Sequence, residues 1–302
     1  MRTAASGLRT FWEFARPHTI IGTVLAVCAL YILASHSAHR QDPGMWLVVL
    51  IASVAVNVYV VGLNQLTDVE IDRINKPYLP LAAGSLRRPS AVVIVVAAGV
   101  AALVLAGTQS GYLFAAIAVI FLIGTGYSLP PVRLKRFPFF AAASIVLARA
   151  VVANIGVYLA YSASLTGRAA LPAYVLLLVG FLFGFAIVIA LMKDVPDADG
   201  DRRNQISTLV LRIGPAATVR LCQGILAACY LGVILAGLIG VPGTRGWLLV
   251  ATHAGALAVM LLGARGLDAG DPKAVHRYYM LVWKLFYFEF LAIPLAVLAG
   301  PH

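Results

Sequence analysis

Long apolar stretches recur along the whole chain and constrain its fold more than any other feature. A helix that crosses a bilayer needs about 20 mostly apolar residues. Nine stretches reach that length or approach it with their small flanking residues: 20–33, 45–66, 91–106, 112–127, 139–161, 171–192, 217–239, 247–264 and 280–298. Charged residues make up 12% of the chain, about half of the ~25% typical of soluble domains. The sequence therefore predicts one all-α domain over residues 1–302, a polytopic membrane protein with nine transmembrane helices, and disfavours a soluble bundle.

The distribution of Lys and Arg predicts how the chain is oriented. With nine spans, 18 of the 23 Lys and Arg residues fall on the side of the N-terminus and 3 on the other side. Cytoplasmic loops are enriched in these residues, so we expect the N-terminus in the cytoplasm of a bacterium and the spans in its inner membrane. Because the bases are spread over five segments, the net charge of +11 indicates contact with anionic membrane lipid and no nucleic-acid partner.

Two short segments concentrate the carboxylates of a chain that has only 12 acids. The first, "NQLTDVEIDRINKP" at 64–77, carries Asp68, Glu70 and Asp72. The second, "KDVPDADGD" at 193–201, adds four more; its acids are Asp194, Asp197, Asp199 and Asp201. The two segments follow the second and the sixth apolar stretch, so both lie on the cytoplasmic side, where solvated loops are usually basic.

The spacing within these segments predicts a site for a divalent cation. Residues four apart share one helix face, so Asn64, Asp68 and Asp72 form one stripe from which Glu70 points away. Facing carboxylates repel unless a cation or a proton intervenes. Oxygen ligands with no nearby His or Cys suit Mg²⁺, with Mn²⁺ as the alternative, and Mg²⁺ usually completes its shell with substrate phosphates. Two carboxylate walls therefore suggest a metal-bridged diphosphate, although ordinary polar loops remain the alternative.

Basic residues that could hold phosphate oxygens lie on the same side of the membrane. Lys76 follows the first acidic segment, and Arg133 and Lys135 follow the "YSLPP" sequence at 127–131, which begins with Tyr127. Arg and Lys are the usual phosphate ligands, and Tyr127 could order the same group. The alternatives are contact with lipid headgroups for the bases and an interfacial position for the tyrosine.

Together these motifs resemble the UbiA-type intramembrane prenyltransferases, and in detail the homogentisate prenyltransferase branch. The resemblance is carried by "RPHTIIGT" at 16–23, "NQLTDVEIDRINKPYLPLAAG" at 64–84, "YSLPP" and the second acidic segment. It implies nine helices around a central cavity that opens sideways to lipid. It further implies the following ligands: Asn64, Asp68 and Asp72 at a first metal, Asp194, Asp197 and Asp201 at a second, and Lys76, Arg133 and Lys135 on the diphosphate, with Arg16 of the first motif as a further base.

The resemblance also implies a reaction. An isoprenyl diphosphate ionises at its allylic C–O bond, the metal and the bases stabilise the leaving diphosphate, and an aromatic acceptor attacks the resulting cation. With homogentisate as acceptor, its carboxyl group leaves as CO₂. Alternatives within the fold are transfer to another aromatic acid such as 4-hydroxybenzoate, or a membrane terpene cyclase. A cation or lipid-phosphate transporter is disfavoured because the acids gather at one membrane face. Neither the prenyl length nor the oligomeric state is predicted.

Arg149 stands out because it lies inside the fifth apolar stretch. An ionisable group at that depth is costly and usually faces the bundle interior. We expect it to act in catalysis by binding the acceptor carboxylate or a phosphate, or else to form a structural pair with Glu289. His18 and the aromatic run "WKLFYFEF" at 283–290 are weaker candidates, since interfacial or lipid-facing positions explain such residues equally well.

Overall fold

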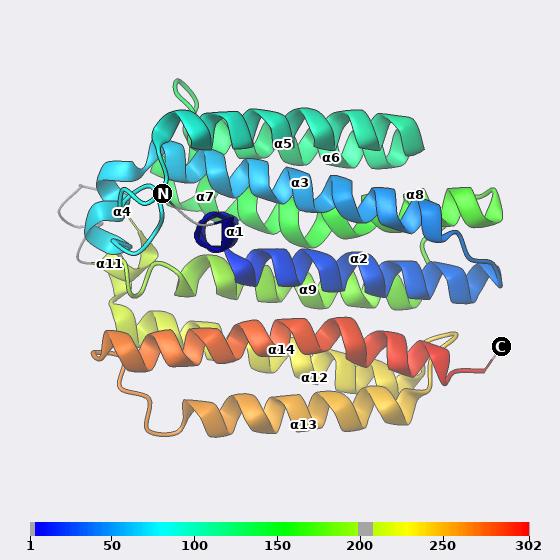
Figure 1. The fold of residues 1–302 in the computed structure, drawn as a ribbon. Helices are drawn as coiled ribbons and strands as arrows, with labels where there is room; N and C mark the ends of the chain where they lie inside the picture. Colours follow the sequence, from blue (N-terminus) through cyan, green and yellow to red (C-terminus); the bar gives the residue numbers. More distant parts are fainter. Residues whose placement is uncertain (1–3, 199–207, 302) are drawn as a thin grey trace.

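The computed structural model of the protein describes residues 4–198 and 208–301. These residues form helices joined by turns, without a β-strand among them. The long helices lie side by side with alternating direction, and the two chain ends lie at opposite ends of the bundle (Figure 1). This is the all-α architecture that the sequence predicts.

Nine spans within the described residues are long and apolar enough to cross a membrane, which confirms the predicted number. They are α2 (Pro17–Ala38), α3 (Pro43–Thr67), α5 (Arg88–Gln109), α6 (Gly111–Ser128), a composite fifth span, α9 (Ala173–Met192), α12 (Pro215–Ile239), α13 (Gly246–Ala264) and α14 (Pro272–Leu298). The fifth span consists of α7 (Pro138–Val146), the π-helix η2 (Leu147–Val152) and α8 (Ala153–Thr166).

Most spans are longer than the apolar stretches that predicted them. Five spans begin with a proline, at residues 17, 43, 138, 215 and 272. Proline suits the first helical turn, where its missing N–H has no helical partner in any case. The polar or small residues between such a proline and the apolar stretch continue the helix, which a count of apolar residues cannot detect.

Short helices gather at the end of the bundle that carries the N-terminus. They are α1 (Ala4–Phe14), α4 (Val69–Asn75), the 3₁₀ helix η1 (Leu134–Arg136) and α11 (Leu209–Ile213). Helix α1 runs across the long helices rather than along them (Figure 1). It is held there by Phe14, whose ring is fully buried and whose backbone oxygen accepts a 2.7 Å hydrogen bond from Gln65 Nε2. A Cβ atom at Gly62 would lie 2.8 Å from that ring, so only glycine lets Phe14 pack against α3.

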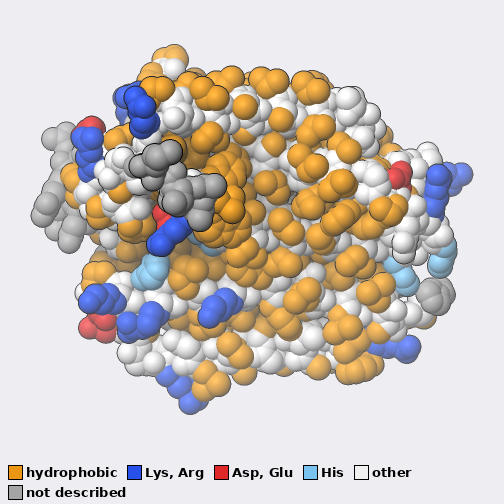
Figure 2. All heavy atoms as spheres, viewed as in Figure 1, with side chains coloured by type: hydrophobic (Ala, Val, Ile, Leu, Met, Phe, Trp, Pro, Cys, Tyr) orange, Lys and Arg blue, Asp and Glu red, His pale blue; other side chains and the backbone are white. Residues whose placement is uncertain are grey.

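Hydrophobic side chains cover the length of the bundle, whereas Lys and Arg side chains gather toward its ends (Figure 2). Large apolar side chains such as Val93 and Leu122 are two-thirds exposed. A soluble protein rarely exposes so large a contiguous apolar surface, but such a surface is expected where the surrounding medium is hydrocarbon. The protein is therefore an integral membrane protein.

Candidate functional site

A cavity of about 1710 Å³ lies inside the bundle. It is larger than the roughly 300–1,000 Å³ of most ligand pockets, so it has room for two substrates together. Its mouth lies where α3, α6 and α9 end and where α2, α7 and α14 begin, and both predicted acidic segments line it there. Deeper in, its walls are mainly apolar; they include Val27, Leu30, Val56, Ile117, Val157 and Phe290.

The first acidic segment forms a break between two helices rather than one continuous helix. Helix α3 ends at Thr67, and Asp68, with φ −117° and ψ 16°, separates it from α4. The predicted neighbours still meet, because Asn64 Nδ2 donates a 2.8 Å hydrogen bond to Asp68 Oδ2. Glu70 points away as expected and pairs with Arg73 at 2.8 Å, both exposed.

Asp72 is a buried carboxyl group at the cavity mouth, with 6% of its surface exposed. Its carboxylate makes no hydrogen bond or ion pair with any residue that the structure describes. Burial raises the pKa of Asp72 to about 6; Arg16 and Lys76 act in the opposite direction, and Asp68 and Asp197 add to the rise. Carboxylates of both acidic segments therefore act on one buried acid, as a shared cation site requires.

The second acidic segment follows α9 as a series of turns, because Pro196 cannot continue the helix. Asp194 accepts a 2.6 Å hydrogen bond from Lys193 Nζ. Asp197 is paired with Lys76 Nζ across 121 residues of sequence. Both acids line the cavity mouth, whereas Asp201, a predicted ligand, lies outside the described residues.

The predicted bases also meet the acids at this mouth. Lys135 Nζ lies 2.5 Å from Asp68 Oδ1 and 2.8 Å from Thr67 Oγ1. Arg133 approaches the same Asp68 oxygen at 3.4 Å. Burial lowers the pKa of Lys135, and the charge and hydrogen bond of Asp68 oppose that change. The structure therefore brings the predicted phosphate ligands and metal ligands together.

Two bases at the mouth are held by unusual backbone conformations. Arg16, which precedes α2, has φ 56°, and Arg133, which precedes η1, has φ 38°. Residues other than glycine rarely adopt this left-handed region, and such conformations cluster at functional sites. Arg16 Nε is buried without a hydrogen-bond partner in the described structure. Tyr127, near the end of α6, lines the same mouth.

The donor set at the mouth fits Mg²⁺. Amide and carboxylate oxygens are the ligands that this ion prefers, and Asp72 is a buried acid with no protein partner among the described residues. No three His, Cys, Asp or Glu side chains of the described part of the chain are close enough to form a complete metal cage. Mg²⁺ commonly completes its coordination with substrate phosphates. Asn64, Asp68 and Asp72 on one wall, and Asp194 and Asp197 on the other, would hold it.

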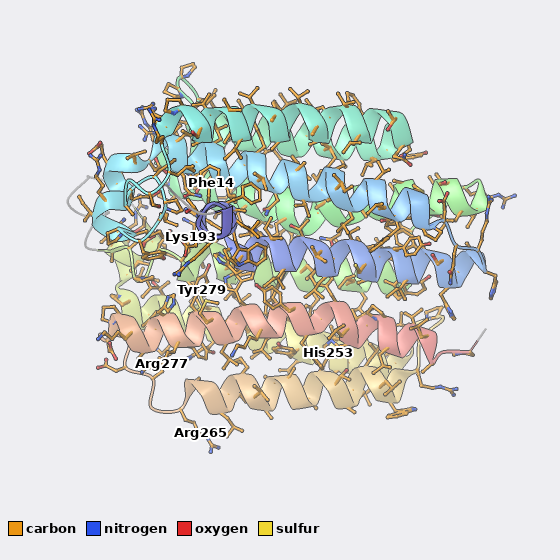
Figure 3. All side chains as sticks on the ribbon, in the orientation of Figure 1. Phe14, Lys193, His253, Arg265, Arg277 and Tyr279 are labelled. Atoms are coloured by element: carbon orange, nitrogen blue, oxygen red, sulfur yellow. The ribbon has the colours of Figure 1, made fainter. Side chains whose placement is uncertain are left out.

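Arg149 lines the cavity well inside the fifth span, on the π-helix η2. The structural pair with Glu289 considered from the sequence is wrong, since Glu289 Oε1 lies 3.0 Å from His253 Nε2 and both residues are fully buried. Figure 3 shows His253 between α13 and α14. The guanidinium carbon of Arg149 instead lies 5.2 Å from the centre of the Trp283 ring. Helix α9 packs against both η2 and α14, and Arg149 and Trp283 both line the cavity.

Several cavity residues carry no strong sequence signal. Tyr78, Tyr279 and His276 all line the cavity. Figure 3 shows Tyr279 and Lys193 at the end of the bundle where the mouth lies. Tyr78 is 69% exposed and lies within the electrostatic influence of Arg16, Asp197 and Asp72. The only feature of the sequence that could have identified Tyr78 as a cavity residue is its position two residues after Lys76.

Comparison with known proteins accounts for this arrangement. The sequence pattern of the UbiA prenyltransferase family matches residues 23–285. The chain belongs to the UbiA prenyltransferase family. It is 39% identical to homogentisate phytyltransferase of Synechocystis sp., over 96% of each chain. It is 38% identical to homogentisate geranylgeranyltransferase of Triticum aestivum, over 95% of this chain and 72% of the relative.

Solved structures of UbiA proteins have the same fold. A UbiA homologue from Archaeoglobus fulgidus, bound to GPP and Mg²⁺, is 17% identical with a TM-score of 0.62, over 94% of this chain and 99% of that one. A UbiA homologue from Aeropyrum pernix gives a TM-score of 0.65 at 17% identity, over 93% and 97% of the two chains. The family and the fold confirm the resemblance read from the motifs, and the chain is a prenyltransferase.

Proposed function

We propose that this UbiA prenyltransferase transfers an isoprenyl group from an isoprenyl diphosphate to homogentisate, with loss of CO₂. The observation that carries the proposal is the meeting of both acidic segments with Lys76, Arg133 and Lys135 at the mouth of one large apolar cavity. A diphosphate requires cations and metal ligands, and an isoprenyl chain requires an apolar wall. The cavity has cations and metal ligands at its mouth and an apolar wall further inside.

The residues at the mouth bind and orient the diphosphate. Mg²⁺, for which Mn²⁺ can substitute, supplies electrostatic stabilisation of the negative leaving group. Its ligands in this proposal are Asn64, Asp68, Asp72, Asp194, Asp197 and Asp201. Lys76, Arg133, Lys135 and Arg16 then donate to the phosphate oxygens, and Tyr127 orders the same group at the end of α6. Cations that are already in place stabilise charge as it develops without reorganisation.

The deeper cavity holds the isoprenyl chain and keeps water from the allylic cation. Its lining is mainly apolar and includes the aromatic side chains of Phe286 and Phe290. A ring face attracts a cation, and exclusion of water prevents hydrolysis of a reactive intermediate. We infer that the isoprenyl diphosphate enters from the surrounding lipid, where its hydrocarbon chain is already dissolved.

The relatives favour homogentisate over other acceptors. Proteins named as homogentisate phytyl-, geranylgeranyl- and solanesyltransferases are 35–39% identical to this chain. Transfer to 4-hydroxybenzoate and terpene cyclisation are therefore the less favoured alternatives. The charge bias of the loops supports insertion into a bacterial inner membrane with the N-terminus and the cavity mouth in the cytoplasm.

The deciding experiment is an assay of the purified protein in detergent with Mg²⁺. Homogentisate and 4-hydroxybenzoate are each offered with phytyl, geranylgeranyl and solanesyl diphosphates, and products are identified by mass. We expect prenylated homogentisate without its carboxyl carbon. Prenylated 4-hydroxybenzoate would overturn the acceptor, and a cyclised hydrocarbon formed without an acceptor would overturn the reaction type.

Two variants test the metal walls separately in the same assay. Asp68→Ala and Asp201→Ala each remove a ligand from a different wall, so each is expected to abolish turnover while the protein stays folded. Glu70→Gln is the matched control, because Glu70 is exposed and faces away from the cavity. Normal turnover in either alanine variant would contradict the two-wall assignment.

A further inference from the structure

The acidic groups that line the cavity are confined to its mouth, where they are mixed with bases. The carboxylates that line it belong to Glu13 of α1 and to the two acidic segments at the mouth, and Glu13 is paired with Arg9 at 2.9 Å. Further in, the charged groups described along the cavity are basic: Arg149 on η2, with His18 on α2 nearby. A metal–diphosphate complex needs acids, whereas this inner region suits an anion.

Arg149 and Trp283 meet at the same depth. Each lies eleven residues after the proline that begins its span, Pro138 or Pro272, which corresponds to about 17 Å along a helix. Both spans start at the mouth, and helical side chains tilt toward the start of their helix. We therefore expect the side chain of Arg149 to point back toward the mouth.

The donors at this meeting point have no acceptor. The guanidinium of Arg149 makes no hydrogen bond or ion pair with any residue that the structure describes. Trp283 is 2% exposed, and its indole N–H approaches the hydroxyl of Tyr279 without completing a hydrogen bond to any described residue. Buried donors are normally satisfied, so unpaired donors that line a cavity indicate a missing acceptor group.

The backbone around Arg149 is built to hold it in place. A π-helical turn is rare and is found mostly at functional sites. Here Asn154, which is 2% exposed, donates 2.9 Å hydrogen bonds to the backbone oxygens of Arg149 and Ala150. The ring of His18 packs edge-on against Trp283, with 4.9 Å between ring centres. The side chains on both sides of the site are thus fixed by packing.

We propose that Arg149 and Trp283 form the seat for the carboxylate of the aromatic acceptor. The planar guanidinium matches a carboxylate in a two-bond geometry, and the indole N–H provides a further donor. The acceptor ring then extends toward the mouth, where the allylic carbon lies. A phosphate is the less suitable occupant, because four other bases and the metal ligands already surround the diphosphate at the mouth. This assignment rests on the proposed function, and it makes Arg149 the residue that selects acidic acceptors.

The test compares substrates in wild type and in Arg149→Met, which removes the charge but keeps much of the side-chain length. We expect KM for homogentisate to rise at least about tenfold, while KM for the isoprenyl diphosphate stays within about twofold. The inhibition constant of 2-methylhydroquinone, which has a methyl group in place of the carboxymethyl group, should also stay within about twofold. Trp283→Phe should give a smaller rise in KM for homogentisate alone.

Lys284→Met is the matched control, since Lys284 is also a cation within a span but is exposed away from the cavity; it should leave all three constants unchanged. If Arg149→Met does not fold, Arg149→Lys keeps the charge without the two-bond geometry and should still raise KM for homogentisate. A rise in KM for the isoprenyl diphosphate instead, or no change in either variant, overturns the assignment.

If the wild-type protein transfers no isoprenyl group to homogentisate, the proposed function is wrong, whatever the role of Arg149. The same comparison with 4-hydroxybenzoate and phenol then tests the carboxylate seat by itself, because these two acceptors also differ by one carboxylate. Loss of discrimination between them in Arg149→Met would support the seat, and retained discrimination would overturn it.

Discussion

The ammonium group of Lys76 contacts the carboxylate of Asp197, which lies 121 residues further along the chain. This contact joins the two acidic segments directly across the cavity mouth. Asp68 is similarly held by Lys135 at 2.5 Å. Each acidic wall is thus neutralised by a base that, in the proposed reaction, binds the diphosphate. Binding of a metal–diphosphate complex would exchange these partners, with the carboxylates moving to metal and the lysines to phosphate.

Replacing Lys76 by Met should therefore weaken binding of the isoprenyl diphosphate. We expect its KM to rise about tenfold or more, with KM for the acceptor little changed, because a charge-assisted hydrogen bond contributes roughly 1.5–3 kcal/mol. Steady-state kinetics with each substrate varied in turn measures both constants. Arg73→Met is the control, because Arg73 is exposed and pairs with Glu70 outside the cavity; an equal effect in the control would argue against a specific contact.

Asp72 should make the stability of the metal-free protein depend on pH. Burial raises its pKa from 3.8 to about 6, so the folded state favours the neutral form. The contribution to stability is fully present below the unfolded-state pKa and is lost as pH rises through about 6. In EDTA, wild type and Asp72→Asn should have similar Tm values near pH 4, and wild type should fall below the variant by pH 7.

Mg²⁺ provides the internal check on that measurement. At pH 7 it should raise the Tm of wild type and have less effect on Asp72→Asn, because the variant lacks one negative ligand. A Tm difference between the two proteins that stays constant from pH 4 to pH 7 would contradict a raised pKa at Asp72.

Filling the inner cavity should shorten the isoprenyl chain that the protein accepts. Ala153 follows η2 and lines the cavity one helical turn deeper than Arg149. Ala153→Phe adds a ring there, so activity with the longest isoprenyl diphosphate should decline before activity with the shortest. A panel of donors of increasing length measures the shift. Val93→Phe, on the outer face of α5, should leave the length preference unchanged.

The close approach of α12 and α13 predicts that alanine substitutions at two glycines of α13 have different effects on stability. A Cβ atom at Gly246 would lie 2.3 Å from the backbone oxygen of Gly237, whereas nothing lies within 4 Å of a Cβ at Gly255. Gly246→Ala should therefore destabilise the protein by about 1–3 kcal/mol and lower its Tm in detergent. Gly255→Ala should be neutral or slightly stabilising, since alanine favours the helix. Equal Tm values would show that the two helices can separate at no cost.

Local chemistry determined much of this protein from sequence alone. Nine apolar stretches predicted nine spans because hydrocarbon requires every backbone polar group to be paired within a helix. The four-residue spacing of Asn64 and Asp68 predicted their contact, which the 2.8 Å hydrogen bond bears out. Counting spans also predicted that the acidic segments and the bases gather at one end of the bundle, where they line the cavity mouth. Such inferences depend only on near neighbours and on which end of a helix a residue occupies.

Other features depended on how distant segments pack. Sequence spacing did not predict the break at Asp68, the pairing of Lys76 with Asp197, or the contact of Arg149 with Trp283, 134 positions away. It also suggested Glu289 as a partner of Arg149, although Glu289 pairs with His253. Apolar periodicity shows that a helix crosses the membrane, but not how it is rotated or which helix it touches. The rotation and the neighbours of each helix are set by packing around the cavity. Only the tertiary structure decided that Arg149 and Trp283 line the same cavity in contact with each other.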